Sequence, residues 1–165
     1  MAVKIIDCKT AAQDFVQNFM PRELEISKQV KHNNLLTTLD HFELNNKNYI
    51  ITELARFDLL QYLRLKGGLR ETLVRRIFYE LISGIDHLHQ NGLVHRDIKC
   101  ENLLISTDGT VKVADFGFAR TVGDSELTRG IDIDRLIGFY VEHMSIPTDR
   151  ARHTVDQLLT QRPKC

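Results

Sequence analysis

Two residues separated by a short β-rich segment have side chains suited to binding a metal ion. Asn102 and Asp115 carry hard oxygen atoms, which are the donors that Mg²⁺ prefers in proteins. Between them, Leu103–Ile105 and Val111–Val113 flank the turn sequence Ser-Thr-Asp-Gly, a pattern that predicts a β-hairpin. A hairpin of this length returns the chain so that Asp115 lies beside Asn102. The two side chains could therefore bind one metal ion together.

These residues belong to two motifs that follow each other along the chain. The first is Val94-His-Arg-Asp-Ile-Lys-Cys-Glu-Asn-Leu-Leu104, and the second is Ala114-Asp-Phe-Gly117. Together they resemble the catalytic loop and the metal-binding motif of eukaryotic Ser/Thr protein kinases. The alternative is that Asp97 and Asp115 are solvated turn residues. Two long motifs in the expected order, joined by a predicted hairpin, favour the kinase interpretation.

The resemblance implies roles for the charged residues. Asp97 would accept the proton of an incoming hydroxyl, and Lys99, typical of Ser/Thr rather than Tyr kinases, would contact the γ-phosphate. In Ala2-Val-Lys4, which resembles the end of the family's V-A-I-K strand, Lys4 would hold the α- and β-phosphates of ATP. Glu23 matches the helix glutamate that pairs with this lysine. Considered alone, Lys4 and Glu23 would be ordinary surface charges.

The resemblance also implies an adenine pocket. Tyr49-Ile-Ile-Thr-Glu-Leu-Ala55 resembles the last strand and hinge of the small lobe, with Thr52 at the gate of the pocket. Backbone groups of Glu53 and Ala55 would meet the adenine edge. Further expected cofactor-binding positions are Ala2 and Leu104. The implied cofactors are ATP and Mg²⁺, and the implied reaction is transfer of the γ-phosphate to protein Ser or Thr.

Within this family, the chain is most similar to the testis-specific Ser/Thr kinases. The segments that carry this similarity are Phe19–Ile26, Asp58–Tyr62, Asp97–Asn102 and Asp115–Arg120. Calmodulin-dependent-type kinases share parts of the same segments. The resemblance runs continuously from Ala2 to Thr128.

The chain departs from the family pattern at several places. No Gly-rich loop with its two strands precedes Lys4, and no A-P-E motif follows Asp115. We expect the large helix that supports the catalytic loop to be missing, and therefore little phosphoryl transfer. Arg152 stands where the family pairs an arginine with the A-P-E glutamate. Ser27 occupies a position that usually holds a buried apolar residue; the alternative is that it faces water.

The expected fold class is α+β, a kinase-like two-lobed fold that is incomplete, without the Gly-rich loop strands and the central helices of the large lobe. Residues 1–54 would form a partial small lobe, 55–129 a partial large lobe with the catalytic and metal-binding loops, and 130–165 a remnant of the C-terminal helices. Strands are predicted at Ala2–Cys8, Leu35–Leu44 and Tyr49–Glu53, and the turn-rich Asn45–Asn48 joins the last two into a hairpin. A helical region is predicted over Ala11–Lys31, broken at Pro21, and further helices at Glu71–Gln90, Asp132–Met144 and Thr154–Leu159. The apolar stripe of the helix from Glu71 would be left partly uncovered.

Composition excludes several other classes of protein. The 165 residues contain 22 basic and 22 acidic side chains, so no basic excess indicates nucleic-acid binding. Three dispersed cysteines favour a reducing, cytoplasmic setting. No apolar stretch is long enough for a membrane span. His87 and His89 are interpreted as the surface end of a helix rather than a metal site.

Three functional interpretations remain open. The first is an active protein Ser/Thr kinase that acts on protein substrates. The second is a catalytically impaired binding or regulatory protein that engages a full-length kinase, a regulator or a chaperone. The third is a partial gene product. The set Lys4, Glu23, Asp97, Asn102 and Asp115 favours the enzyme.

Overall fold

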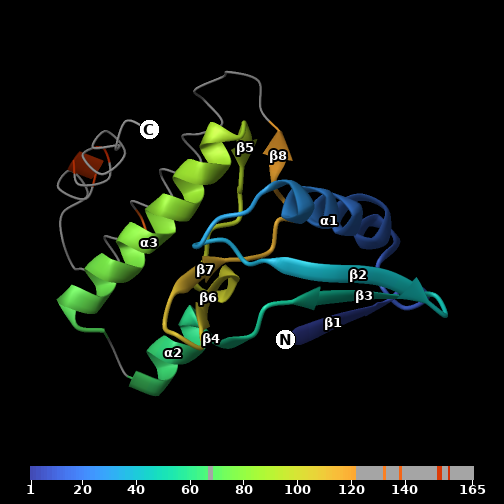
Figure 1. The fold of residues 1–165 in the computed structure, drawn as a ribbon, viewed down its shortest axis with the longest axis horizontal. Helices are drawn as coiled ribbons and strands as arrows, with labels where there is room; N and C mark the ends of the chain where they lie inside the picture. Colours follow the sequence, from blue (N-terminus) through green and yellow to red (C-terminus); the bar gives the residue numbers. More distant parts are fainter. Residues whose placement is uncertain (67–68, 122–131, 133–137, 139–151, 154–155, 157–165) are drawn as a thin grey trace.

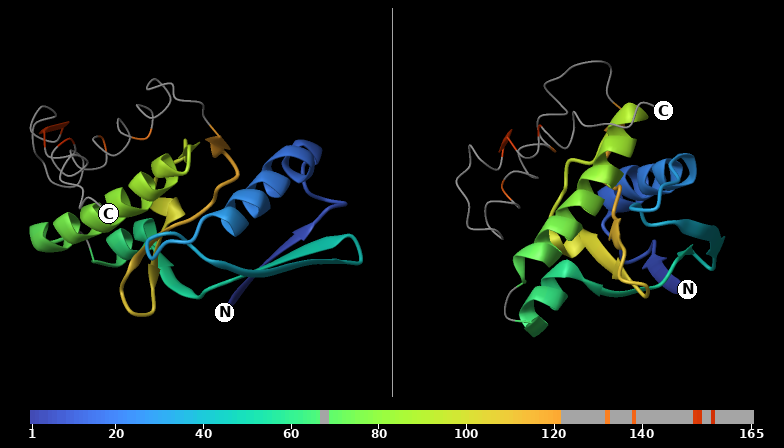
Figure 2. Two further views of the ribbon diagram at one scale, coloured as in Figure 1. Left: turned by 45° about the horizontal axis from the view of Figure 1, so that its top comes forward. Right: turned by 60° about the vertical axis from the view of Figure 1, so that its left-hand side comes forward.

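The structure, a computed structural model, describes residues 1–66, 69–121, 132, 138, 152–153 and 156. Helices and strands form two parts that lie side by side (Figure 1). One part contains α1 and a sheet of β1, β2 and β3, and the other contains α2, α3 and the strands from β4 onward. The same separation is visible after rotation (Figure 2, left). The expected α+β class is therefore confirmed.

The first part is built on an antiparallel sheet in the order β1-β3-β2. Its strands are β1 (Ala2–Asp7), β2 (Thr38–Leu44) and β3 (Lys47–Thr52). Asn45 and Asn46 connect β2 to β3 with φ angles of 52° and 59°. Asparagine tolerates this left-handed region, which suits the tight turns that join antiparallel strands. The predicted hairpin is thus confirmed, with strand ends that differ by a few residues.

Two helical segments cover one face of this sheet. A π-helix, η1 (Phe15–Phe19), runs directly into α1 (Met20–Gln29), with Pro21 in the first turn of α1. Proline has no N–H to donate, so it is tolerated only where a helix begins. The predicted break lies one residue earlier than expected, and the helical region begins later than Ala11.

The core between helix and sheet is small and apolar. Ile6, Met20, Leu24 and Ile50 form its buried centre. Ser27 is also buried, and its hydroxyl donates a hydrogen bond to the Leu24 carbonyl at 3.1 Å. The alternative in which Ser27 faces water is therefore excluded.

The second part begins immediately after the sheet. Its elements are β4 (Ala55–Asp58), α2 (Leu59–Lys66), α3 (Glu71–Gln90), β5 (Leu93–Val94), the 3₁₀-helix η2 (Cys100–Asn102), β6 (Leu103–Ser106), β7 (Val111–Val113) and β8 (Arg120–Thr121). Strands β4, β6 and β7 form one antiparallel sheet, and β5 pairs with β8. The predicted hairpin is β6–β7. Its tight turn includes Gly109 at φ 88°, a conformation suited to glycine.

Helix α3 is the main support of this second part. Its ends coincide with the predicted ones, and Gly92 follows it at φ 69°. Ile77, Leu81, Ile85 and Leu88 are at most 2% exposed, since they pack into one cluster with residues of α1 and β5–β7. The expectation of an uncovered stripe was wrong, because strands and loops bury it. Among the described helices, none is long and apolar enough to span a membrane.

The segment after α1 joins the two parts. The backbone of Asn34 accepts a hydrogen bond from Val113 N–H at 2.9 Å, and Leu36 N–H donates to the Val113 carbonyl at 2.8 Å. The Asn34 side chain donates to the Val111 carbonyl at 3.1 Å. This segment therefore extends the edge of the β6–β7 hairpin and presses against α3 at Gly84.

Substitution of Gly84 tests this junction. A Cβ atom there would lie 2.8 Å from the Asn34 carbonyl oxygen and 3.2 Å from Leu35 Cδ2. The overpacking should outweigh the helix propensity gained by alanine, so Gly84→Ala should lower the free energy of unfolding by about 1–3 kcal/mol. Urea denaturation measures the change.

Gly138→Ala is the matched control, because no heavy atom of the described chain lies within 4 Å of its Cβ position. It should leave the unfolding free energy unchanged or raise it. Equal stability of Gly84→Ala and the unmodified protein would show that the segment after α1 is not packed tightly on α3.

Candidate active site

Lys4 and Glu23 are brought together from β1 and α1. The Lys4 ammonium donates to both carboxylate oxygens of Glu23, at 2.8 and 3.0 Å. The Lys4 side chain is 45% exposed and that of Glu23 is 14% exposed. A pair with one exposed member adds little stability. Its importance is geometric, because it fixes the direction of the Lys4 side chain.

The loop between β5 and η2 holds a second pair. The carboxylate oxygen Oδ2 of Asp97 accepts hydrogen bonds from Lys99 Nζ at 2.7 Å and from Asn102 Nδ2 at 2.9 Å. Asn102 Nδ2 also donates to the Asp97 carbonyl at 2.8 Å. Because the amide nitrogen of Asn102 is used in this way, its oxygen is the atom that remains for a metal ion.

These contacts determine the protonation states. Partial burial of Asp97 opposes ionisation, but the hydrogen bonds from Lys99 and Asn102 outweigh it and hold the pKa of the carboxyl below its usual value. The hydrogen bond to Asp97 raises the pKa of Lys99. At neutral pH, Asp97 is therefore a carboxylate and Lys99 an ammonium.

The β6–β7 hairpin places Asp115 beside Asn102, as the sequence predicts. Ala114 N–H donates to the Asn102 carbonyl at 2.8 Å, so the two chain segments are adjacent just beyond the paired strands. Asp115 has a φ of 66°, and its Oδ1 accepts a hydrogen bond from Gly117 N–H at 3.3 Å. This left-handed backbone turns the chain sharply between β7 and Phe116.

Asn102 and Asp115 together offer oxygen donors of the kind that Mg²⁺ binds. Magnesium in proteins usually keeps several waters or phosphate oxygens and takes only one or two protein ligands. Two oxygen donors from the protein are therefore enough for a magnesium ion that is shared with a phosphate. The described residues contain no group of three His, Cys, Asp or Glu side chains that could hold a metal ion.

His95 supports the loop from inside the core. Its Nε2 contacts the Ala114 carbonyl at 3.1 Å, and its Nδ1 accepts a hydrogen bond from Asp97 N–H at 3.2 Å. Complete burial lowers the pKa of His95 more than the neighbouring carboxylates raise it. The ring is therefore neutral and donates from Nε2. It also meets the buried Phe116 edge to face, at 5.7 Å between ring centres.

The sequence analysis missed Asp132, which anchors the same loop. Its buried carboxylate accepts hydrogen bonds from the backbone N–H groups of His95 and Arg96, both at 2.8 Å. His89 Nε2 lies 3.1 Å from the same carboxylate. The expectation that the loop lacks support was therefore incomplete, since Asp132 supplies it. The sequence shows only an acid between two isoleucines, which gives no indication of this contact.

Asp132 also corrects the interpretation of His89. This histidine is 7% exposed, so it is not part of a helix surface. Burial by itself would raise the pKa of Asp132. The hydrogen bonds from His89, Arg96 and His95 lower the pKa by more than burial raises it, so it lies below the usual value. His87 differs, because its ring stacks on His32 with 4.9 Å between centres.

A cavity of about 300 Å³ lies where β1, β3 and β4 meet η2 and β6. Its lining includes all the predicted cofactor-binding positions except Lys4: Ala2, Thr52, Glu53, Ala55 and Leu104. Lys4 lies two residues beyond Ala2 on the same face of β1, turned toward α1. The structure therefore places most of the predicted adenine positions around one space.

Both carboxylate oxygens of Glu53 have partners in neighbouring segments. One carboxylate oxygen accepts a hydrogen bond from Thr37 N–H at 2.8 Å, and the other pairs with Lys112 at 3.0 Å. Glu53 N–H donates to the Thr37 carbonyl at 3.1 Å. Of the two backbone groups of Glu53, the carbonyl is thus the one that a ligand could meet.

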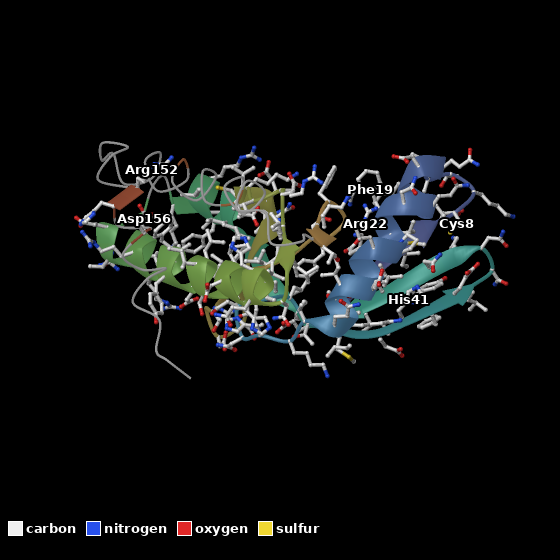
Figure 3. All side chains as sticks on the ribbon, turned by 90° about the horizontal axis from the view of Figure 1, so that it is seen from above. Cys8, Phe19, Arg22, His41, Arg152 and Asp156 are labelled. Carbon is white, nitrogen blue, oxygen red and sulfur yellow. The ribbon has the colours of Figure 1, made fainter. Side chains whose placement is uncertain are left out.

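Three arginines, which the sequence analysis did not single out, gather beside the loop. Arg22 of α1 donates to the Gly117 carbonyl at 3.3 Å, and Figure 3 shows it beside Phe19 on the helix. Burial, and then the charges of Arg22 and Arg96, lower the pKa of Arg120. Within the described residues, none of the three forms an ion pair.

Comparison with known proteins agrees with this geometry. The protein kinase domain family matches residues 1–159. Testis-specific serine/threonine-protein kinase 1 of Mus musculus is 43% identical over 122 residues, which cover 73% of this chain and 33% of that protein. Testis-specific serine/threonine-protein kinase 4 of Homo sapiens is 39% identical over 127 residues, with 76% and 39% covered. The human hormonally up-regulated neu tumor-associated kinase is 38% identical over 125 residues, with 74% and 18% covered.

The chain thus spans about a third of the length of the testis-specific relatives it matches. The predicted similarity to this subfamily is confirmed. Residues 130–165, which were predicted to be a remnant of the family's C-terminal helices, lie almost wholly outside the described residues. Of the two helices predicted there, Asp132–Met144 and Thr154–Leu159, the structure describes Asp132, Gly138 and Asp156, each in helical conformation. Arg152 is also described, and it is helical and exposed.

Substitution of Asp132 tests the anchoring of the loop. Asp132→Asn replaces an ionised acceptor with an amide whose NH₂ group cannot accept from a backbone N–H. It should lower the free energy of unfolding by about 2–5 kcal/mol at pH 7 and speed amide exchange at His95 and Arg96. Urea denaturation measures the change in stability, and hydrogen exchange measures the change at the two amides. Asp40→Asn, on the exposed face of β2, is the control and should change neither.

The same variant has an expected pH dependence. A carboxyl with a lowered folded pKa stabilises the protein above its unfolded pKa of about 3.9, and this contribution is lost as pH falls through the folded pKa. The stability difference between the unmodified protein and Asp132→Asn should therefore shrink below about pH 4. A difference that stays constant from pH 7 to pH 3 would contradict the role of the ionised carboxylate.

Proposed function

Because this chain belongs to the protein kinase domain family, we propose that it carries the phosphoryl-transfer centre of a protein Ser/Thr kinase. The observation that carries the proposal is the position of Asp97, whose carboxylate is held by both Lys99 and Asn102. An ionised acid fixed in this way can receive a proton without first rearranging. The substrate class, protein Ser or Thr hydroxyls, follows from the similarity to Ser/Thr kinases.

The proposed roles of the residues follow from their charges and contacts. Asp97 would orient the substrate hydroxyl and accept its proton, while Lys99 would face the transferred phosphoryl group. Lys4, held in place by Glu23, would contact the remaining phosphates of ATP. Asn102 and Asp115 would hold Mg²⁺. When bound, the metal ion would neutralise charge on the phosphate oxygens.

The cavity beside β4 is the proposed adenine site. Ala2 and Leu104 would enclose the ring from two sides, and Thr52 would limit the depth of the pocket. The Glu53 carbonyl and the backbone of Ala55 would meet its polar edge. Residues 1–54 and 55–129 would then correspond to the two lobes on either side of the nucleotide, with 130–165 as a C-terminal remnant.

The arginine cluster supports regulation of this centre by phosphorylation. Arg22 of α1, Arg96 of the loop between β5 and η2, and Arg120 of β8 lie close enough that the charges of the first two lower the pKa of the third. Kinase activation segments become ordered when a phosphorylated side chain pairs with arginines. We place the protein in the cytoplasm, where ATP and protein substrates are abundant. A kinase or chaperone could act as a regulatory partner there.

Nucleotide binding gives the first test of the proposal. Mg-ATP should bind the purified chain, and the affinity should fall when MgCl₂ is replaced by EDTA. Lys4→Met and Asp115→Asn should each weaken binding by about tenfold or more, since each removes a charge-assisted contact. Isothermal titration calorimetry measures the dissociation constants. Lys9→Met, in the exposed turn after β1, removes the same charge and should bind normally.

Phosphoryl transfer gives the second test. With radiolabelled ATP and a pool of Ser- and Thr-containing peptides, Asp97→Asn should reduce transfer by about 100-fold or more. Asp14→Asn, on the exposed surface before η1, is the matched control and should retain activity. If Mg-ATP binds but no variant differs in transfer, the chain is a nucleotide-binding regulatory protein rather than an enzyme.

A further inference from the structure

A second cavity lies on the β6–β7 side of β4, beside the proposed nucleotide site. Its volume is about 230 Å³. The walls are mainly apolar and come from four elements: β4, α2, the first half of α3 and the β6–β7 hairpin. The apolar lining residues are Phe57, Tyr62, Leu73, Ile77, Ile105 and Val111. A space of this size accommodates one or two large side chains rather than a whole cofactor.

Fixed contacts hold the cavity open. The rings of Phe57 and Tyr62 lie 6.3 Å apart across the step from β4 to α2. On the opposite wall, Glu80 accepts a hydrogen bond from Val111 N–H at 2.6 Å and pairs with Arg76 at 2.9 Å. Arg76 Nη2 also donates to the Gly109 carbonyl at 2.6 Å. The hairpin and α3 are therefore tied together at this wall.

The rim of the cavity is positively charged. Arg56 is exposed and forms no ion pair within the described chain, whereas the charge of Arg76 is balanced by Glu80. The segment from residue 56 to 76 contains six basic residues and only two acidic ones, although the chain as a whole is neutral. This segment includes all of α2 and the start of α3 (Figure 1), and Tyr62 and Leu73 of these helices line the cavity. The local potential therefore favours an anionic partner.

We propose that this cavity is a docking site for a linear acidic segment of a partner protein, in which a leucine-like side chain lies next to glutamate or aspartate. The apolar side chain would fill the space between Leu73 and Ile105. The neighbouring carboxylate would pair with Arg56. An apolar wall beside an exposed arginine matches this combination of groups, whereas a nucleotide phosphate would leave the apolar wall without a partner.

The site is separate from the chemistry of phosphoryl transfer. Only Arg56 and Phe57 also line the proposed nucleotide cavity. A segment bound here would contact residues of α2, α3 and the β6–β7 hairpin that do not line the nucleotide cavity. Docking therefore requires no nucleotide and can be tested without any catalytic activity.

Fluorescence anisotropy with the complete chain tests the proposal. The probe is a fluorescein-labelled peptide, Glu-Glu-Leu-Glu-Leu-Glu-Glu, titrated without nucleotide in low salt. Arg56→Glu should weaken binding by about tenfold, because an attraction becomes a repulsion at the rim. Arg64→Glu makes the same charge change on α2 outside the cavity lining and should weaken binding by less than about threefold. Thr107→Trp, at an exposed lining position, should block the cavity and abolish binding.

Two further peptides separate charge from shape. A peptide with serine in place of both leucines should bind at least about tenfold more weakly, and one with lysine in place of every glutamate should not bind. Circular dichroism confirms that each variant is folded. Equal binding of the serine peptide, equal effects of Arg56→Glu and Arg64→Glu, or no effect of Thr107→Trp would each overturn the proposal. Concentration-dependent dimers that Thr107→Trp abolishes would instead identify the cavity as an interface between copies of this chain.

Discussion

The carboxylate of Asp132 is a charge that is completely removed from water, and such a charge persists only where donors surround it. The donors are two consecutive backbone N–H groups, from His95 and Arg96, and the ring of His89. This arrangement holds Arg96 at a φ of 68°, a conformation that costs energy in a residue with a side chain. The loop that carries Asp97 thus takes its shape from a residue that follows it by more than thirty positions.

Other buried groups transmit this constraint toward the metal-binding turn. His95, neutral because it is buried, joins the loop to the Ala114 carbonyl and contacts the ring of Phe116. Asp115 lies between these two residues, so its position depends on the same packing. Asn102 completes the connection by binding Asp97 through its side chain and Ala114 through its backbone. The candidate proton acceptor and metal ligands are therefore parts of one hydrogen-bonded unit.

Strand β4 has an equally central position in the organisation of ligand sites. It follows the first sheet after only two residues and pairs with β6 of the second. Residues of β4 line both cavities, and Arg56 and Phe57 belong to the lining of each. The segment at Asn34–Leu36 provides the other connection between the parts, through hydrogen bonds to Val113 and a close contact with Gly84. Two short connections thus set the relation between the lysine–glutamate pair and the catalytic loop.

Local patterns in the sequence were sufficient to predict the ends of α3 and the two hairpins. The family resemblance singled out Asp97, Asn102 and Asp115 as candidate site residues, and the structure brings them close together. Helical periodicity, turn residues and short motifs depend on neighbours along the chain, so they can be interpreted without a structure. The pairing of Lys4 with Glu23 came from the family resemblance, and the tertiary structure supplied the contact. Only the folded chain revealed the burial of His89, the anchoring by Asp132 and the cavity beside Arg56, and it decided between the buried and the exposed interpretation of Ser27. Each of these depends on packing between segments distant in sequence, where a polar side chain that becomes buried looks like any surface residue until its donors and acceptors are located in space.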